Sequence, residues 1–157
     1  MRRPFGKGMK RALAGLAALC LFSPALTAPA LAQVPDPFAR DLARQLSVAE
    51  SADAHRDFFR IAGPFAGGLA PHLNRRIQVT LRAGQQHEVI GVCDMRCGGL
   101  NLRVYDGADR LLAQGAPLGA MRVVHVRPVI TNPHTIEVTL DSCGEAECFY
   151  AFNVYAR

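Results

Sequence analysis

Apolar and polar residues alternate along most of the chain after about residue 57. Ile77, Val79 and Leu81, for example, are separated by single polar residues. A period of two places successive side chains on opposite faces of a strand, so this pattern predicts strands with one face in a core and the other in solvent. The strands predicted from alternation or from short apolar runs cover residues 58–61, 77–81, 87–93, 100–104, 111–112, 123–126, 136–140 and 148–154.

Glycine, proline, asparagine and aspartate separate the predicted strands. The Gly-Pro pair at 63–64 is expected to end the first strand. Residues 83–85 are expected to form a turn from which 87–93 returns, and the Asp-Gly pair at 106–107 offers a hairpin turn. Seven to eight short strands with this punctuation predict an all-β fold over residues 57–157, an antiparallel and jelly-roll-like β-sandwich.

A different pattern precedes the strands, in the segment 33–56. Asp36 can cap a helix, with Pro37 at its first position. Apolar residues then recur at intervals of three and four, which predicts a helix over about residues 37–54. The apolar stripe is narrow, so we expect the helix to pack on the outside of the domain. Its members are Leu42, Leu46 and Ala49.

A charged and then apolar segment stands before the helix, in residues 1–32. Five basic residues and no acid precede residue 12, an apolar run follows at 12–22, and Ala-Leu-Ala at 30–32 ends the segment. These are the parts of a signal peptide, with cleavage expected between Ala32 and Gln33. A membrane anchor is the alternative, but eleven residues rise only about 16 Å as a helix, against a hydrocarbon core of about 30 Å. We therefore expect a periplasmic or secreted bacterial protein, exported by the general secretory or the twin-arginine route, that is not an integral membrane protein after processing.

The net charge changes when the predicted signal peptide is set aside. The whole chain carries 18 basic and 13 acidic residues, a formal charge of +5. Five of the basic residues and none of the acids lie in residues 1–32, which leaves 13 of each and a net charge of zero. A nucleic-acid-binding domain is expected to show a basic stripe, whereas the remaining chain has a single adjacent basic pair, Arg75-Arg76. We therefore expect no nucleic-acid partner.

Four cysteines lie in the predicted mature chain: Cys93, Cys97, Cys143 and Cys148. An even number in an exported chain predicts two disulfides. A four-thiolate zinc site is the alternative, but the spacings C-x3-C and C-x4-C differ from those of the usual zinc knuckle. Spacing does not choose among the three possible pairings. Loop-closure entropy favours a long-range pair such as Cys93–Cys148, by about 4 kcal/mol against about 2 kcal/mol for a short loop.

Two segments that contain these cysteines resemble a known family. One reads GVCDMRCGGLNLRVYD at 91–106, and the other reads VTLDSC at 138–143 followed by CFYA at 148–151. Both resemble bacterial pre-peptidase C-terminal domains and their stand-alone exported relatives, over about residues 75–157. The resemblance implies a β-sandwich with a non-catalytic accessory or binding role.

The resemblance also favours local disulfides, Cys93–Cys97 and Cys143–Cys148. Residues four apart in a straight strand are separated by about 13 Å, which exceeds the limit of about 7 Å between the Cα atoms of a disulfide. The chain must therefore turn between the members of each pair. Glycines at 98–99 and at 144 are compatible with such turns.

Some members of that family bind calcium through acidic residues around the corresponding loop. Here the candidate metal ligands are Asp94, Asn101 and Asp106. Arg96, Gly99 and Asn101 stand where those members are rich in acids. Calcium prefers six to eight oxygen ligands, several of them carboxylate. We therefore expect no tight calcium site, and no cofactor.

No recognisable catalytic motif accompanies the predicted sandwich. A G-x-S-x-G elbow is missing, and Ser142 is expected to bond the backbone of its turn. His87 and Glu88 lack the second histidine of a zinc-protease motif, and His125 is expected on the outer face of a strand. Three acids could converge at one edge of the sandwich but are expected to be solvated: Asp94, Asp106 and Asp109.

These observations favour an exported, non-enzymatic β-sandwich module, monomeric, that binds a protein or a cell-envelope partner. The alternatives are a structural envelope-associated protein without a discrete ligand, and a hydrolase with an unrecognised site. An exposed, concave apolar patch would favour binding, because monomers seldom expose large ones. A uniformly polar surface would favour the structural role, and a pocket that joins a histidine to a carboxylate would favour an enzyme.

Overall fold

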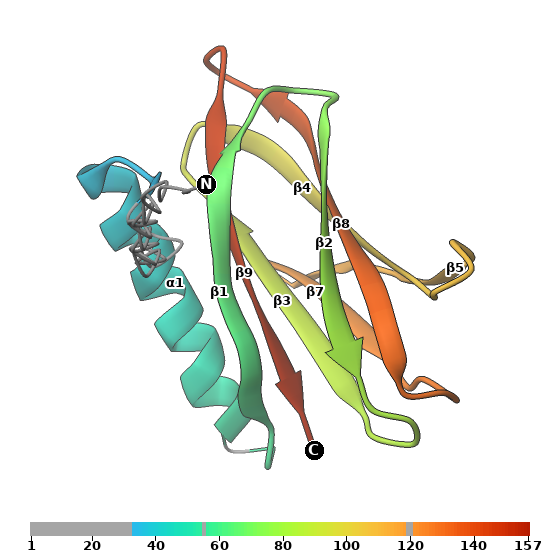
Figure 1. The fold of residues 1–157 in the computed structure, drawn as a ribbon. Coiled ribbons are helices and arrows are strands. Elements are labelled where there is room, and N and C mark those ends of the chain that lie inside the picture. Colours follow the sequence, from blue (N-terminus) through green and yellow to red (C-terminus); the bar gives the residue numbers. More distant parts are fainter. Residues whose placement is uncertain (1–32, 55, 119–120) are drawn as a thin grey trace, which may run out of the picture.

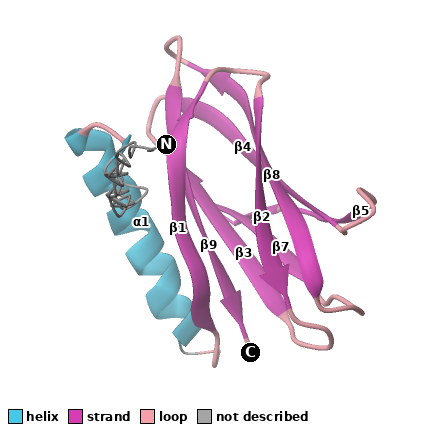
Figure 2. Ribbon diagram, in the orientation of Figure 1, coloured by secondary structure: helices cyan, strands magenta, loops and turns pink. Residues whose placement is uncertain are grey.

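Two antiparallel β-sheets packed face to face, with one helix, form the part of the chain that the computed structural model describes, residues 33–54, 56–118 and 121–157 (Figure 1, Figure 2). The predicted all-β sandwich with an N-terminal helix is therefore confirmed. The predicted signal peptide, residues 1–32, lies outside the described residues. No described helix is both long enough and apolar enough to cross a membrane.

Nine strands are present among the described residues, slightly more than alternation predicts. The first sheet contains, in order across it, β1 (Phe59–Leu69), β9 (Cys148–Ala156), β3 (His87–Cys93), β7 (Met121–Val126) and β6 (Ala116–Leu118). The second sheet contains β2 (Asn74–Leu81), β8 (Asn132–Cys143), β4 (Cys97–Tyr105) and β5 (Leu111–Gln114).

Most consecutive strands lie in different sheets. The chain crosses between the sheets from β1 to β2, from β2 to β3 and from β3 to β4, then from β5 to β6, and again from β7 to β8 and from β8 to β9. Two packed antiparallel sheets connected in this way form a jelly roll. The crossings bring loops from distant parts of the sequence together at the two ends of the sandwich.

The turn at 83–85 connects the two sheets rather than two hydrogen-bonded strands. β2 pairs with β8, whereas β3 pairs with β7 and β9. The returning strand predicted at 87–93 thus exists but lies across the core from β2. β3 differs from β2 in the residues on its outer face, where it carries the buried apolar residues Ile90 and Val92. A strand that is apolar on both faces needs cover on both.

The Gly-Pro pair at 63–64 does not end the first strand, contrary to the prediction. β1 continues through it to Leu69, with register shifts within residues 60–65. β1 is an edge strand that pairs with β9 alone. An edge strand tolerates proline because one of its sides has no partner strand, and its irregular register makes the free edge a poor template for another chain.

The main core lies between the sheets and is formed by the inner faces of the alternating strands. Side chains at every second position meet there and exclude water, which stabilises the fold by roughly 25 cal/mol for each Å² of apolar surface buried. The strand residues whose alternation predicted the sandwich are among its members: Val79, Leu81, Leu100, Leu102, Val104, Ile136, Val138, Leu140, Tyr150, Phe152 and Val154.

Helix α1 (Asp36–Ala54) covers the outer face of the five-stranded sheet, as its narrow stripe predicts (Figure 1). Leu42 and Leu46 are buried in one cluster with Val92 and Ala151. The helix begins one residue before the predicted range, because the backbone carbonyl of the preceding proline accepts its first hydrogen bonds, both of 3.0 Å.

Candidate functional site

Two disulfides lie together at one end of the sandwich, which we call the disulfide end. Cys93–Cys97 closes the turn between β3 and β4 with 6.0 Å between Cα atoms, and Cys143–Cys148 closes the turn between β8 and β9 with 5.8 Å. The local pairing predicted from the resemblance is confirmed. Cys97 and Cys143 are opposite each other in the register of β4 and β8, so the two bridges brace neighbouring turns.

Asp94, a candidate metal ligand, is buried at the disulfide end with its side chain 1% exposed. Its carboxylate accepts hydrogen bonds from the backbone N–H groups of Arg96 (2.9 Å) and Phe149 (2.7 Å) and from the Arg96 guanidinium (2.8 Å). Burial, the largest influence, raises the pKa of Asp94, but the hydrogen bonds from Arg96 and Phe149 together lower it below its ordinary value. These donors occupy the oxygen atoms that a cation would need.

The Arg96 guanidinium also joins the helix to the sheet. It lies 4.0 Å from the ring centroid of Phe38 in α1 and 5.5 Å from that of Phe149 in β9, and the two rings are 5.1 Å apart. Guanidinium groups are attracted to the faces of aromatic rings at such distances. Arg96 therefore acts as a structural partner of Asp94 and of the contact between α1 and β9.

The other two candidate metal ligands are also held by protein groups. Asn101, in β4, donates a hydrogen bond of 2.5 Å to Asp141. Asp106 follows β4 and accepts hydrogen bonds of 2.9 Å from the backbone N–H groups of Ala108 and Arg110. The bond from the Arg110 backbone is the main reason why the pKa of Asp106 is lowered.

Asp94, Asp106 and Asp109 do not converge at one edge. The expectation that all three are solvated is wrong for Asp94, which is buried, whereas the Asp109 side chain is 67% exposed. Asp94 precedes β4, whereas Asp106 and Asp109 follow it, and β4 is nine residues long, or about 26 Å from end to end. Asp109 pairs with Arg76 instead. In the part of the chain that the structure describes, no three His, Cys, Asp or Glu side chains are grouped as a metal site requires.

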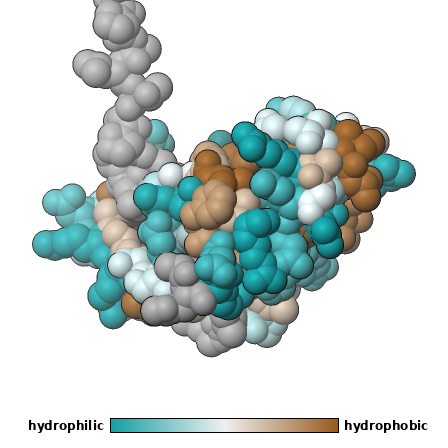
Figure 3. Space-filling model, turned by 90° about the horizontal axis from the view of Figure 1, so that it is seen from below, coloured by the Kyte–Doolittle hydropathy of each residue, from teal (hydrophilic) through white to brown (hydrophobic). Residues whose placement is uncertain are grey.

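An apolar groove lies at the opposite end of the sandwich, which we call the groove end. It has a volume of about 540 Å³. Val129 and Ile130, in the loop between β7 and β8, are 90% and 64% exposed beside it. Figure 3 views the molecule from this end, with hydrophobic surface on the side where Figure 1 places β5 and the start of β8. The groove is lined by Leu112, Val126, Pro128, Val129 and Ile130, with a polar rim of Asp106, Arg110, His125, Arg127, Asn132 and His134.

The loop that carries Val129 and Ile130 is fixed to the neighbouring turn between β2 and β3. The backbone N–H of Gly84 donates to the carbonyl of Pro128, and that of Ala83 donates to the hydroxyl of Thr131, both at 2.8 Å. These bonds hold the polar groups at each end of the loop against the protein. The apolar side chains between them are left in contact with water.

A second, polar hollow of about 370 Å³ adjoins the groove. We call it the arginine hollow, because three guanidinium groups line it. It shares His125, Val126 and Arg127 with the apolar groove. Its other lining residues are Arg56, Phe58, Gln86, His87, Glu88 and Arg157.

Glu88 is the fully buried carboxylate of the arginine hollow. Its two oxygens accept hydrogen bonds of 3.0 and 2.8 Å from Arg56, and His125 Nδ1 lies 3.0 Å from Oε1. The His125 side chain is 68% exposed, so its predicted position on the outer face of a strand is confirmed. A buried carboxylate is stable only when paired, and Arg56 and His125 supply this pairing.

Arg157 and Arg127 face the same hollow without a carboxylate partner among the described side chains. Arg157 donates to the side chain of Gln86 at 2.5 Å and to the carbonyl of Arg56 at 3.3 Å, and its guanidinium lies 4.8 Å from the ring centroid of Phe58. Arg127 donates to the carbonyl of Gly84 at 2.8 Å. The hollow is therefore positively charged and can accept an anion.

The sequence contains a signal for Glu88 that pattern reasoning did not use. Glu88 is the single acid in residues 87–93, a segment otherwise apolar after its histidine. An acid in a doubly covered strand predicts a buried partner. The partner Arg56 could not be identified from the sequence, because it lies 32 residues away and reaches Glu88 only through the fold.

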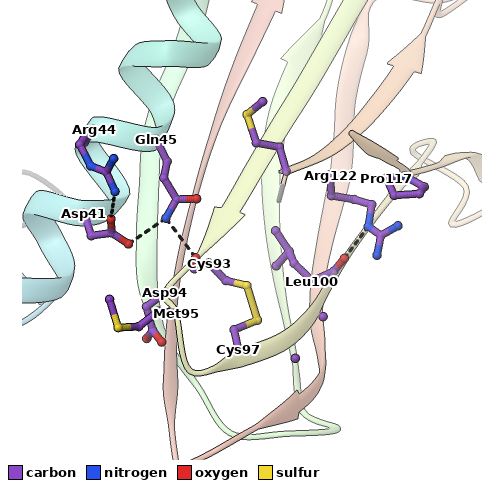
Figure 4. A pocket seen from close by; sticks show the side chains of 13 residues that line it. Asp41, Arg44, Gln45, Cys93, Asp94, Met95, Cys97, Leu100, Pro117 and Arg122 are labelled. Carbon is purple, nitrogen blue, oxygen red and sulfur yellow. Dashed lines mark hydrogen bonds and ion pairs between the residues drawn. A yellow bond between two sulfur atoms is a disulfide. The ribbon is translucent and has the colours of Figure 1, made fainter. Parts of the chain in front are cut away.

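A third hollow, of about 570 Å³, lies between α1 and the disulfide end (Figure 4). Its polar side chains are satisfied by the protein itself. Gln45 donates to Asp41 at 2.9 Å and to the carbonyl of Cys93 at 3.3 Å, and Arg122 donates to the carbonyl of Leu100 at 2.6 Å. These contacts attach the helix and β7 to neighbouring elements, so this hollow is a weaker candidate for ligand binding.

No family model matches the chain, and no curated protein matches it.

Proposed function

We propose that the protein is an exported, non-catalytic β-sandwich module that binds a protein or cell-envelope partner through the apolar groove. The observation that carries the proposal is the exposure of Val129 and Ile130, at 90% and 64%, beside a concave surface. Exposed apolar side chains grouped at a concave surface, rather than scattered singly, are typical of interaction sites. Burial of these side chains against a partner would be favourable by roughly 25 cal/mol per Å².

Export is supported by three features. The two disulfides are of the kind that persists in oxidising compartments. The pattern of residues 1–32 is that of a signal peptide. The resemblance to stand-alone exported relatives of pre-peptidase C-terminal domains points to the same location and to a binding role.

A hydrolase is the second candidate, because the arginine hollow joins His125 to Glu88 as a general base would require. The surroundings of the pair favour binding instead. Arg56 donates to both oxygens of Glu88. The positive charge of Arg56 therefore offsets the negative charge with which Glu88 would make His125 a stronger base. The described residues that line the hollow include no serine, threonine or cysteine that could act as nucleophile.

Capture from an envelope fraction tests the binding function. The protein is expressed from the full sequence, purified after any processing and immobilised beside two variants, Val129→Asp and Val48→Asp. Val48 is a matched control, because it is a valine of α1 that is 63% exposed and lies outside the groove. We expect one partner to be retained by the wild type and by Val48→Asp and lost from Val129→Asp. Equal retention by all three proteins would contradict the proposal.

A further inference from the structure

A ligand in the apolar groove also meets the arginine hollow, because His125, Val126 and Arg127 line both. Resting on the proposed binding function, we infer that the site takes an anionic amphiphile. Its acyl chain lies in the apolar groove, and its carboxylate or phosphate head lies in the arginine hollow.

The charge of the arginine hollow favours an anionic head. Three arginines face it, and Glu88 is its one acidic side chain. Glu88 is already paired with Arg56, which leaves Arg127 and Arg157 to attract an anion.

Arg127 is placed to join the two parts of the ligand. It lines both hollows, and its Nε donates to the carbonyl of Gly84 at 2.8 Å, which orients the guanidinium. A guanidinium presents paired donors that match a carboxylate or a phosphate. Arg110, the other arginine of the groove, is already paired with Asp106 at 2.7 Å, so Arg127 is the cation of the groove that has no carboxylate partner among the described side chains.

The walls of the groove favour an acyl chain over a peptide. An extended peptide is held chiefly by main-chain hydrogen bonds to its receptor. The carbonyl of Pro128 and the hydroxyl of Thr131 are already bonded to the turn at 83–84, and Pro128 has no N–H. The bonded groups at the two ends of the loop face the turn at 83–84, and the exposed side chains between them, Val129 and Ile130, provide apolar contacts that suit a chain that needs no hydrogen bonds.

A second copy of the protein is a poorer occupant of the same surface. A two-fold interface places each residue close to the same region of its partner. Two copies joined here would bring Arg127 and Arg157 of one copy close to those of the other, and like charges at an interface oppose association.

Titration calorimetry with decanoate and the uncharged decanol tests the inference. We expect decanoate to bind about tenfold more tightly at low salt, because hydrogen bonds to charged groups are the stronger ones. At about 1 M salt the Debye length is about 3 Å, and the advantage of decanoate should fall below about threefold. Equal affinity for the two ligands at low salt would overturn the inference.

Three variants locate the two ends of the ligand. Arg127→Gln should weaken decanoate about fivefold and leave decanol unchanged, whereas Ile130→Ser should weaken both ligands about fivefold. Arg44→Gln is the matched control, because Arg44 is an exposed arginine of α1 outside both hollows, and it should change neither. Decanoate affinity that is insensitive to Arg127→Gln would contradict the placement of the head.

Two further titrations separate the possible sources of the head and the competing occupant. Dihexanoylphosphatidylglycerol binding more tightly than decanoate indicates a phospholipid, and the reverse order indicates a free fatty acid; both outcomes support the inference. An acidic, apolar peptide that binds where neither amphiphile does would overturn it. If Val129→Asp still abolishes capture of the envelope partner in that case, the proposed binding function stands; if capture is also unchanged, that function fails as well.

Discussion

The two ends of the sandwich satisfy their polar groups in opposite ways. At the disulfide end, Asp94 is buried and bonded to Arg96 and to the backbone of β9, and two disulfides close the neighbouring turns. At the groove end, Arg127 faces solvent without a carboxylate partner among the described side chains, and Val129 is 90% exposed. At the disulfide end, the polar groups therefore bond to one another within the protein. The groove end leaves a charged group and apolar surface available to a partner.

This difference separates stability from recognition along the long axis of the sandwich. Both ends use turns between the same two sheets, so the connectivity does not distinguish them. The distinction comes from side chains: the arginine at 96 lies against a buried acid and two aromatic rings, while the arginine at 127 is tied to one backbone carbonyl. Substitutions at the first end should change the free energy of unfolding, and those at the second should change binding.

Among the substitutions that compare the polar groups of the two ends, Asp94→Ala has the largest expected effect. The substitution leaves the N–H of Phe149 and the Arg96 guanidinium without their acceptor, so we expect the free energy of unfolding to fall by about 2–3 kcal/mol. Asp106→Ala at the other end of β4 should cost only about 1 kcal/mol, because Asp106 bonds within its own turn. Urea unfolding measures both.

Asp94→Asn is the control for this comparison. It keeps the shape and one acceptor oxygen but removes the charge, so its effect should be intermediate. Equal losses for Asp94→Ala and Asp106→Ala would show that the two ends do not differ in how they stabilise the fold.

Removal of the Cys143–Cys148 disulfide should have the next largest effect. Both cysteines are replaced by alanine, because a single replacement leaves a thiol beside the other bridge, where Cys97 is opposite Cys143. A loop of this length should contribute about 2 kcal/mol. Hydrogen exchange should accelerate in the turn at 144–147 and stay unchanged at 129–131, in the groove end. Faster exchange at both ends would show that the ends are coupled.

Strands that have one face in the core and the other in solvent could be predicted from the sequence. Alternation identified the strands around Val79, Leu102 and Val138, because their outer faces are polar. The pairing of β2 with β8 could not be predicted, since a turn looks the same whether it joins neighbours in one sheet or crosses between sheets. The Gly-Pro pair at 63–64 wrongly predicted the end of a strand. A strand can continue through proline when it lies at the edge of a sheet, as β1 does, and the local sequence does not show that position.

The site was less predictable than the fold. The sequence offered Asp94, Asn101 and Asp106 as candidate ligands, because the segment that resembles the family, residues 91–106, contains them. The groove depends on Val129 and Ile130, two loop residues with no periodicity, and on Arg56 and Glu88, which are brought together by tertiary structure. Exposure and long-range pairing are properties of the folded chain, so local sequence carries little information about them.

The pH dependence of stability should differ between the ends, because each contains a titratable group with a lowered pKa. Burial of His87 is the main cause of its lowered pKa, with a contribution from His134, and outweighs a hydrogen bond to the Gln85 backbone that raises it. The unfolded state then binds the proton first, so stability present above pH 6.5 is lost as the pH falls towards the folded pKa. The slope is at most about 1.4 kcal/mol per pH unit for one proton.

The pKa of Asp94 is lowered from 3.8, so the stability that it provides is present above that pH and lost below it. Urea unfolding of the wild type and His87→Gln between about pH 7 and pH 5 separates the two groups, since Asp94 titrates below this range. The variant should show a smaller loss of stability over that range and keep the loss below about pH 4. Identical slopes for the two proteins would exclude His87 as the group responsible.

The smallest expected effect on stability is that of Val129→Ser, and it sharpens the comparison most directly. Val129 is 90% exposed, so its replacement should change the free energy of unfolding by less than about 0.5 kcal/mol. Val124, in the adjoining strand β7, is fully buried in the main core, and Val124→Ser should cost about 3 kcal/mol, because it leaves a cavity and buries a hydroxyl. Urea unfolding of the pair gives the stability arm, and decanol titration of Val129→Ser gives the binding arm, where we expect a loss of about threefold. A large stability loss for Val129→Ser would mean that this side chain supports the fold, and the groove end would then no longer be the end that is free to serve a partner.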